Sequence, residues 1–492
     1  MPDIRYVILS DLHFGAENSV LTSLKPGGIE ADPHKPSAVM ESLVECLAEL
    51  VTKNEGPDQP QLILCGDILE LALATDNIAA MVFDRFLEKA FPPNGPLFDK
   101  TVYFVPGNHD HHLWETARER QYAKYVSKQA PGPEEELSIP WHTTRMVPPK
   151  EEAVEAELLT TLMRRYQHLR EATVVAVYPN LRLTAGERSV VVHHGHFVEG
   201  MYRLMTTLKD MVFPGRPPAD KIWEWEAENF AWIDFFWSTL GRSGEVGADV
   251  GLVYASLQSE PAMKQLAHNL ATGIAGKLTW PSPMRWLGGK VLDFGLGRLV
   301  RLASRLERSD PSKPLSAKAD QGLHLYLQGP LRSQLLEEIG DKWYELPDVP
   351  KDLTFVFGHT HKPFEVELAP KGYRGPVSVY NTGGWVVDSE RSAPLQGGAA
   401  ILLDEDLNVA SLRVYNQEDY RVRLAQVHAD APNPLLDRLS GLIDADAGPW
   451  AALAAATHAV VDERHIDLGE LIKRGPAPVP PPPADPRRSS RP

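Results

Sequence analysis

The stretch Tyr6-Val7-Ile8-Leu9-Ser10-Asp11-Leu12-His13 decides the fold of this chain. Its four apolar residues are typical of a buried β-strand, and an aspartate and a histidine follow directly. The same arrangement occurs four more times, with apolar runs that end at Gly66-Asp67, Gly107-Asn108-His109-Asp110, His194-Gly195-His196 and Gly358-His359-Thr360-His361. In open α/β sheets, ligands bind in the crevice outside the carboxyl ends of the strands. The sequence therefore predicts an α/β fold whose strand ends share one polar site.

The five clusters offer the atoms that divalent transition ions bind, namely imidazole nitrogens together with carboxylate and amide oxygens, and no thiolate. Glycine stands beside the polar residue in four of them, at Gly66, Gly107, Gly195 and Gly358, where a missing Cβ permits a tight turn close to an ion. Two such ions about 3.5–4 Å apart activate water and hold phosphoryl oxygens during an in-line displacement. Phosphoester hydrolysis is the natural use of this set.

The ordered set D-x-H, G-D, G-N-H-[DE], H and G-H-x-H resembles the calcineurin-like metallophosphoesterases. The resemblance covers residues 4–200 and 350–415. It implies a metallophosphoesterase β-sandwich of the α/β class that is flanked by helices. It also implies three ligands for each of two ions and one bridging ligand, namely Asp11, His13 and His361 for the first ion, Asn108, His194 and His359 for the second, and Asp67 as the bridge.

The resemblance implies further roles near these ligands. His109 is similar to the family histidine that touches the scissile phosphate and helps the leaving oxygen depart, with Asp110 as the orienting partner of its ring. His196 is a candidate for contact with the substrate or for support of a ligand. The run Asn381-Thr382-Gly383-Gly384-Trp385 follows another strand and is a candidate for lining the pocket, but an ordinary turn explains it equally well, so it stays outside the predicted site.

The split of the motifs predicts a catalytic domain with an insertion. We expect the first catalytic part at 1–200, a large and mostly helical insertion or cap at 201–350, the second catalytic part at 351–425, a helical segment at 426–475 and a disordered proline-rich tail at 476–492. Helical spacing indicates a helix over 151–169. Extended runs at 364–368, 377–380, 399–403 and 410–414 are consistent with the second sheet of the sandwich.

Within the insertion, residues 223–286 contain six of the eleven tryptophans of the chain. Such aromatic residues usually pack a helical core, and a lipophilic pocket is the alternative. Residues 277–318 carry nine basic residues against three acidic ones, and Arg298 and Arg301 lie within this segment at helical spacing. We interpret the segment either as a solvated basic face or as a surface for peripheral membrane or lipid contact, with both arginines as candidate substrate-binding residues.

Composition limits the other functions. A formal net charge of -16 disfavours general nucleic-acid binding. With only Cys46 and Cys65, we expect no disulfide framework and a reducing compartment. An apolar leader is missing and apolar runs stay short of the roughly 18 residues of a spanning helix, which predicts a cytoplasmic protein, peripheral on the membrane if 277–318 binds lipid. Neither composition nor motif predicts an oligomeric state.

These patterns predict a phosphoester hydrolase with two divalent ions, of manganese, iron or zinc, acting on a small, nucleotide-diphosphate or lipid-linked phosphoester. Gly66-Asp67-Ile68-Leu69-Glu70 lacks the G-D-x-x-D-R-G of protein serine/threonine phosphatases. The run Ser10–Gly15 and the H-G-x form are similar to the bacterial UDP-2,3-diacylglucosamine hydrolase group and to the nuclease subunits of double-strand-break repair complexes. A nuclease and a noncatalytic scaffold with this fold are the alternatives.

The bridging role of Asp67 can be tested by substitution. Asp67→Asn should remove most activity and weaken metal loading, because the substitution removes the carboxylate charge that is expected to hold both ions. His112→Ala should do little, since His112 has no place in the motif. Metal content and hydrolysis of p-nitrophenyl phosphate measure both effects, and equal losses in the two variants would refute the assignment.

Overall fold

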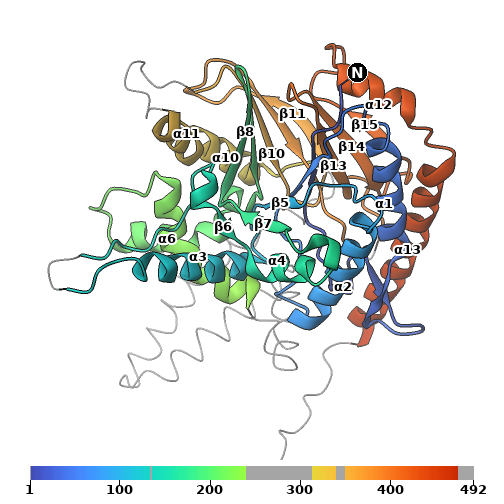
Figure 1. Ribbon diagram of the computed structural model, residues 1–492, viewed down its shortest axis with the longest axis horizontal. Helices are drawn as coiled ribbons and strands as arrows, with labels where there is room; N and C mark the ends of the chain where they lie inside the picture. Colours follow the sequence, from blue (N-terminus) through green and yellow to red (C-terminus); the bar gives the residue numbers. More distant parts are fainter. Residues whose placement is uncertain (1, 133–135, 240–312, 340–348, 390, 475–492) are drawn as a thin grey trace, which may run out of the picture.

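The computed structural model describes residues 2–132, 136–239, 313–339, 349–389 and 391–474 (Figure 1). Two sheets form a sandwich. The larger has eight strands in the order β15 (Arg423–Ala425), β14 (Val409–Asn416), β13 (Gly397–Leu403), β1 (Tyr6–Leu9), β4 (Gln61–Leu64), β5 (Thr101–Phe104), β7 (Thr173–Ala176) and β6 (Val154–Glu155). The smaller has five, in the order β11 (Phe364–Leu368), β12 (Val377–Asn381), β10 (Asp352–Phe357), β9 (Arg188–His193) and β8 (Asn180–Ala185). The predicted α/β sandwich is confirmed.

Alternation along the strands explains the layers. Val7 and Leu9 of β1 belong to the core cluster beneath the helices of the larger sheet, whereas Ile8 belongs to the cluster between the sheets. In β10, Phe355 packs against the helices of the insertion and Val356 faces the sandwich interior. Because successive side chains point to opposite faces, strands that are apolar throughout are buried on both sides.

The strands that precede the five polar clusters lie in both sheets. β1, β4 and β5 run parallel in the larger sheet, and β9 and β10 run parallel in the smaller one. One expectation is wrong in part: the runs at 399–403 and 410–414 form β13 and β14 of the larger sheet, where β13 pairs antiparallel with β1. Alternation alone does not specify which sheet a strand joins.

Helices cover the outer faces of both sheets. Those packed on the larger sheet are α1 (Ala38–Val51), α2 (Asp76–Ala90), α3 (His111–Val126), α4 (Glu157–Arg164), α12 (Pro434–Leu442) and α13 (Gly448–Arg474). Figure 1 shows α13 running alongside α1. The helix expected over 151–169 is shorter than predicted, because Val154–Glu155 forms strand β6 against β7 and only α4 is α-helical.

The described parts of the insertion are mostly helical. The short helix η3 (His196–Val198) leads into η4 (Gly200–Arg203), and then follow α5 (Leu204–Val212), α6 (Ile222–Ile233) and the π-helical turn η5 (Asp234–Ser238), and after the gap α10 (Ala317–Tyr326), η8 (Leu327–Leu331) and α11 (Arg332–Ile339). Trp225 and Trp237 are buried in the core beside the smaller sheet, and Trp223 is 46% exposed. Part of the aromatic set is therefore core.

Arg298, Arg301 and most of 277–318 lie outside the described residues, as does the tail after 474.

The division into domains stays a prediction. Contacts between the C-terminal segment and the start of the chain are clear, since Arg438 of α12 contacts the carbonyl of Pro2 and Asp3. None of the helices within the described ranges is long and apolar enough to cross a membrane.

An aromatic cluster supports the loop after β1. Phe86 of α2 is 1% exposed and its ring centroid lies 5.5 Å from that of Phe14, the residue after His13. Phe86→Ala should lower the free energy of unfolding by about 3–5 kcal/mol, because it leaves a cavity in a close-packed core. Ile466→Ala, at a 65% exposed position of α13, should change it by less than about 0.5 kcal/mol. Chemical denaturation measures both, and similar values would contradict the assigned packing.

Candidate metal centre

Side chains from all five strand ends come together at one end of the sandwich. Three buried groups could each hold an ion, with ligand atoms within 4.8 Å of one another: Asp11, His13 and His361; His13, Asp67 and His109; and Asp67, His194 and His359. The structure thus brings the seven predicted ligands and His109 into one buried neighbourhood. Whether they bind metal stays a prediction.

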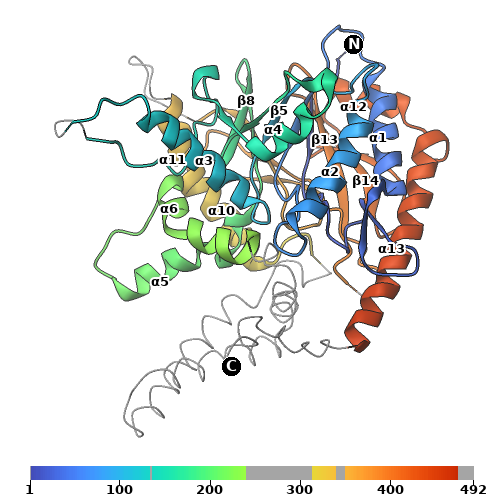
Figure 2. The ribbon, with the colours of Figure 1, turned by 60° about the horizontal axis from the view of Figure 1, so that its bottom comes forward.

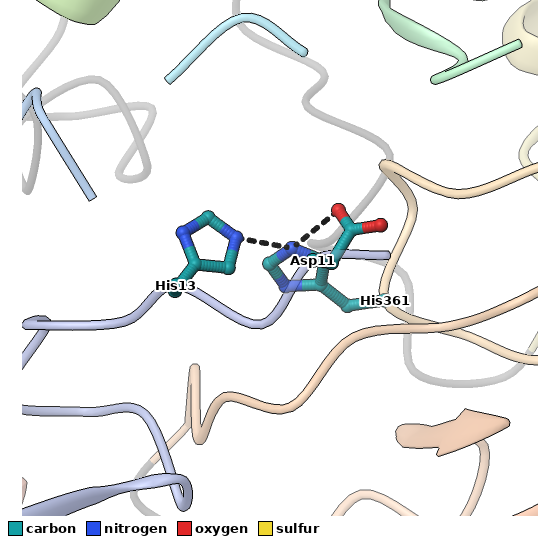
Figure 3. A group of neighbouring side chains, drawn as sticks. All are labelled: Asp11, His13 and His361. Carbon is teal, nitrogen blue, oxygen red and sulfur yellow. Dashed lines mark hydrogen bonds and ion pairs between the residues drawn. The ribbon is translucent and has the colours of Figure 1, made fainter. Parts of the chain in front are cut away.

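The first group combines the loop after β1 with the loop after β10 (Figure 3). Nε2 of His361 lies 3.2 Å from Nε2 of His13 and 3.3 Å from Oδ1 of Asp11. Two imidazole nitrogens this close need a proton or a cation between them. Asp11 also accepts the backbone N–H of His359, so its carboxylate joins both loops.

A second set of side chains, Asp67, Asn108 and His194, comes from the loops after β4, β5 and β9. Nε2 of His194 lies 3.1 Å from Oδ1 of Asn108 and 3.4 Å from Oδ2 of Asp67. The backbone carbonyl of Cys65 lies 3.1 Å from Nδ1 of the same ring, which directs Nε2 toward the group. An amide and an imidazole therefore lie beside one carboxylate.

Asp67 lies between the two groups. Its Oδ1 accepts the backbone N–H of His109 at 2.7 Å. Its Oδ2 is buried and accepts no hydrogen bond from the part of the chain that the structure describes, although Nε2 of His13 lies 3.7 Å away and Nε2 of His194 3.4 Å. A buried carboxylate oxygen without a hydrogen bond needs a compensating charge. This position suits a ligand shared by two ions.

Glu70 supports two histidines at once, and sequence reasoning missed this role. Its Oε2 lies 2.8 Å from Nδ1 of His13 and its Oε1 lies 2.7 Å from Nδ1 of His109. In the same way, Oδ2 of Asp388 lies 2.7 Å from Nδ1 of His361. Carboxylates in this position fix the tautomer and orientation of a ligating imidazole. The placement of Glu70 three residues after Asp67 was a usable signal, but nothing in the local sequence marks Asp388.

The orienting partner expected for His109 was wrong. Asp110 accepts the backbone N–H groups of Gly107 and Ile68, each at 2.7 Å, and Glu70 contacts the His109 ring instead. Burial, together with the nearby charge of Asp67, raises the pKa of Asp110 to about 6. Asp110 therefore joins the loops after β4 and β5. Its catalytic role stays a prediction, which the expected contact with the His109 ring no longer supports.

His196 is fully buried next to the site. Its Nε2 lies 3.1 Å from the hydroxyl of Tyr178, which donates a hydrogen bond to Glu226 of α6 at 2.8 Å. Burial and the neighbouring histidines hold the pKa of His196 well below its usual range, so the ring is neutral. These contacts connect His196 to the insertion, and its role in substrate contact stays a prediction. Nearby, Oε1 of Glu199 lies 3.5 Å from Nε2 of His359.

Backbone strain is concentrated at the predicted ligands. Among the described residues other than glycine, positive φ occurs at seven positions, and five of them are predicted ligands: Asp11, His13, Asp67, His359 and His361. A non-glycine residue in this region costs of order 1–3 kcal/mol and persists only where its surroundings enforce it. The surroundings of these residues are closely packed, since a Cβ on Gly66 would lie 2.4 Å from Nδ1 of His194.

The site stabilises positive charge. Burial alone would raise the pKa of Asp67, but the positive charges of His194 and His109 outweigh it and hold that pKa well below its usual range. Burial would lower the pKa of His194, but Asp67 and Asp11 raise it to about 9. Charged carboxylates beside imidazoles that favour protonation form an environment suited to cations. The donor set therefore fits divalent metal ions.

The run Asn381–Trp385 also belongs to this region, which the sequence did not reveal. The Trp385 backbone N–H donates to the Asp11 carbonyl at 3.0 Å, and Asn381 donates to the Gly358 carbonyl at 2.9 Å. A Cβ on Gly384 would lie 2.4 Å from Cδ2 of His361. This turn therefore supports the loops that carry the first group.

Comparison with known proteins agrees with this geometry. Residues 4–243 match the family of calcineurin-like phosphoesterases. This match supports a metal-dependent phosphoesterase. His359 and His361 lie beyond the matched residues, so their place in the centre comes from the fold.

None of the curated proteins matches the chain. Among solved structures, the chain is similar to phosphopantetheinyl hydrolase (PptH) from Mycobacterium tuberculosis, with 15% sequence identity over 78% of this chain and 90% of that chain and a TM-score of 0.22. A TM-score this low carries no argument about the activity of this chain.

The double contact of Glu70 generates a prediction. Glu70→Gln should weaken metal binding by about 10–100-fold, because the amide cannot hold both Nδ1–H groups as a carboxylate does. Titration of the metal-free protein with Mn²⁺ or Zn²⁺ measures the loss. Glu187→Gln, on an exposed turn, is the matched control and should bind as the unaltered protein does. Equal affinities in the two variants would contradict the supporting role.

Proposed function

We propose that this protein hydrolyses a phosphoester at a centre of two divalent ions. The observation that carries the proposal is the position of Asp67, whose Oδ2 lies between the ε nitrogens of His13 and His194. We assign the first ion to Asp11, His13, Asp67 and His361, and the second to Asp67, Asn108, His194 and His359. When bound, such ions supply an activated water and charge stabilisation for the phosphoryl group.

His109 is proposed to act on the leaving oxygen. Its ring centroid lies 4.9 Å from that of His13, so it stands beside the first group. The carboxylate of Glu70 against Nδ1 orients the ring, whose other nitrogen can then give a proton to the departing oxygen. The neutral amide and imidazole donors add no negative charge that would repel an anionic phosphate.

We propose manganese, iron or zinc as the metal, because histidine and carboxylate ligands suit all three. We propose a small, nucleotide-diphosphate or lipid-linked phosphoester as the substrate. The helical insertion beside the site supports a capped pocket for a compact substrate. A cytoplasmic location, with lipid contact through 277–318, belongs to this proposal and is supported by the sequence alone.

A nuclease and a noncatalytic scaffold are the two alternatives to this function. A nuclease would need a surface that attracts a long polyanion, and a net charge of -16 disfavours it. A noncatalytic scaffold would have no reason to retain two carboxylates and four histidines in a strained and buried cluster.

Metal removal tests the proposal. Dialysis against a chelator should abolish hydrolysis of p-nitrophenyl phosphate or of bis(p-nitrophenyl) phosphate, and addition of Mn²⁺, Fe²⁺ or Zn²⁺ should restore it. Asp67→Asn is the matched variant and should not recover. Absence of activity with every metal would favour the scaffold.

A panel of esters tests the substrate class. Nucleotide diphosphates and lipid-linked phosphoesters should be cleaved in preference to DNA. Cleavage of DNA without cleavage of the small esters would favour the nuclease.

A further inference from the structure

The insertion is hydrogen-bonded to the loop that carries His109. Oγ of Ser238, at the end of η5, donates to the backbone carbonyl of His109 at 3.1 Å and accepts the backbone N–H of His112 at 2.9 Å. Glu226 of α6 lies 2.8 Å from Nε2 of His111. Figures 1 and 2 both place α6 beside α3, although α3 ends at Val126 and α6 begins only at Ile222.

Ser238 fills the role of a missing helix cap. α3 begins at His111, and the first N–H groups of a helix have no partner within it. Its N-cap residue is Asp110, but that carboxylate accepts the N–H groups of Gly107 and Ile68 and makes no capping bond. A hydroxyl both donates and accepts, so Ser238 can satisfy the His112 N–H and hold the His109 carbonyl at once.

Three contacts then determine where the His109 ring stands. Its backbone N–H donates to Asp67, its carbonyl accepts from Ser238, and its Nδ1 meets Glu70. Ser238 comes from the insertion and is fully buried, and the ring of the adjacent Trp237 lies 6.5 Å from the His109 ring, centroid to centroid. The neighbouring contact between His112 and Asp234 lies at the rim, where both side chains are 24% exposed.

We propose that Ser238 is a positioning residue for His109, through which the insertion completes the leaving-group side of the active site. The proposal rests on the proposed function, in which His109 assists the departing oxygen. Loss of the hydroxyl should let the segment 109–112 move, while the metal ligands keep their own partners.

Leaving-group dependence gives a readout that general destabilisation would not change. An alkyl phosphoester needs a proton on its leaving oxygen, whereas p-nitrophenolate departs without one. Ser238→Ala should therefore slow the alkyl ester about tenfold and the p-nitrophenyl ester by no more than about twofold, because a small displacement of a catalytic group is costly where that group acts. Ser238→Thr keeps the hydroxyl and should restore the alkyl rate.

The matched control is Thr239→Ala. The hydroxyl of Thr239 donates to the carbonyls of Asp234 and Phe235 within its own turn, so its removal should leave both esters unaffected. In a His109→Ala background, Ser238→Ala should cause no further loss on the alkyl ester. Equal losses on both esters, or losses that multiply in the double variant, would overturn the proposal.

Hydrogen–deuterium exchange tests the same contact without catalysis. In metal-free protein, Ser238→Ala should speed exchange at the amides of 109–112, where the His112 N–H loses its acceptor, and Thr239→Ala should not. Unchanged exchange would overturn the positioning role. A failure of the proposed function would appear separately, as a His109→Ala variant that slows both esters equally although Ser238 is intact.

Discussion

The centre depends on one buried carboxylate that no hydrogen bond neutralises fully. Burying a charge costs several kcal/mol unless an opposite charge repays it, and Oδ2 of Asp67 meets imidazole nitrogens at 3.4 and 3.7 Å instead of hydrogen-bond donors. Its pKa nevertheless stays well below the usual range, since His194 and His109 outweigh the effect of burial. The surroundings are therefore organised to hold positive charge at Asp67, and two divalent ions are the chemical form of that charge which the donors suit best.

The two sheets hold the strained backbone of the loops that carry the predicted ligands. Asp11 and His13 leave the larger sheet in left-handed conformations, and His359 and His361 leave the smaller sheet in the same way. Each such residue resists its conformation, so the loops need strong mutual contacts. The carboxylate of Asp11, which accepts the N–H of His359, is one of these contacts, and it links the sheets at the point where the ions would bind.

Sequence alone predicted the parts of the site that are local in the chain. A strand end followed by Asp67 or by His194 shows in a few residues, because apolar runs and glycines mark where strands stop. Partners that meet only in the folded chain are harder to predict: nothing in the local sequence marks Asp388 as the support of His361, and the ring of His109 contacts Glu70 instead of the expected Asp110. The sheet membership of 399–403 and 410–414 failed for the same reason, since alternation reports burial and not the neighbouring strand.

The use of Asp110 explains why an insertion became part of the centre. Because its carboxylate joins the loops after β4 and β5, it cannot also cap the helix that it precedes. The uncapped N–H of His112 then needs an acceptor from elsewhere, and Ser238 supplies one at 2.9 Å. A segment recruited to satisfy a helix end thereby contacts the carbonyl of His109 as well. A change at Ser238 of η5 would then act on the reaction through His109, although Ser238 lies far from the catalytic loop in the sequence.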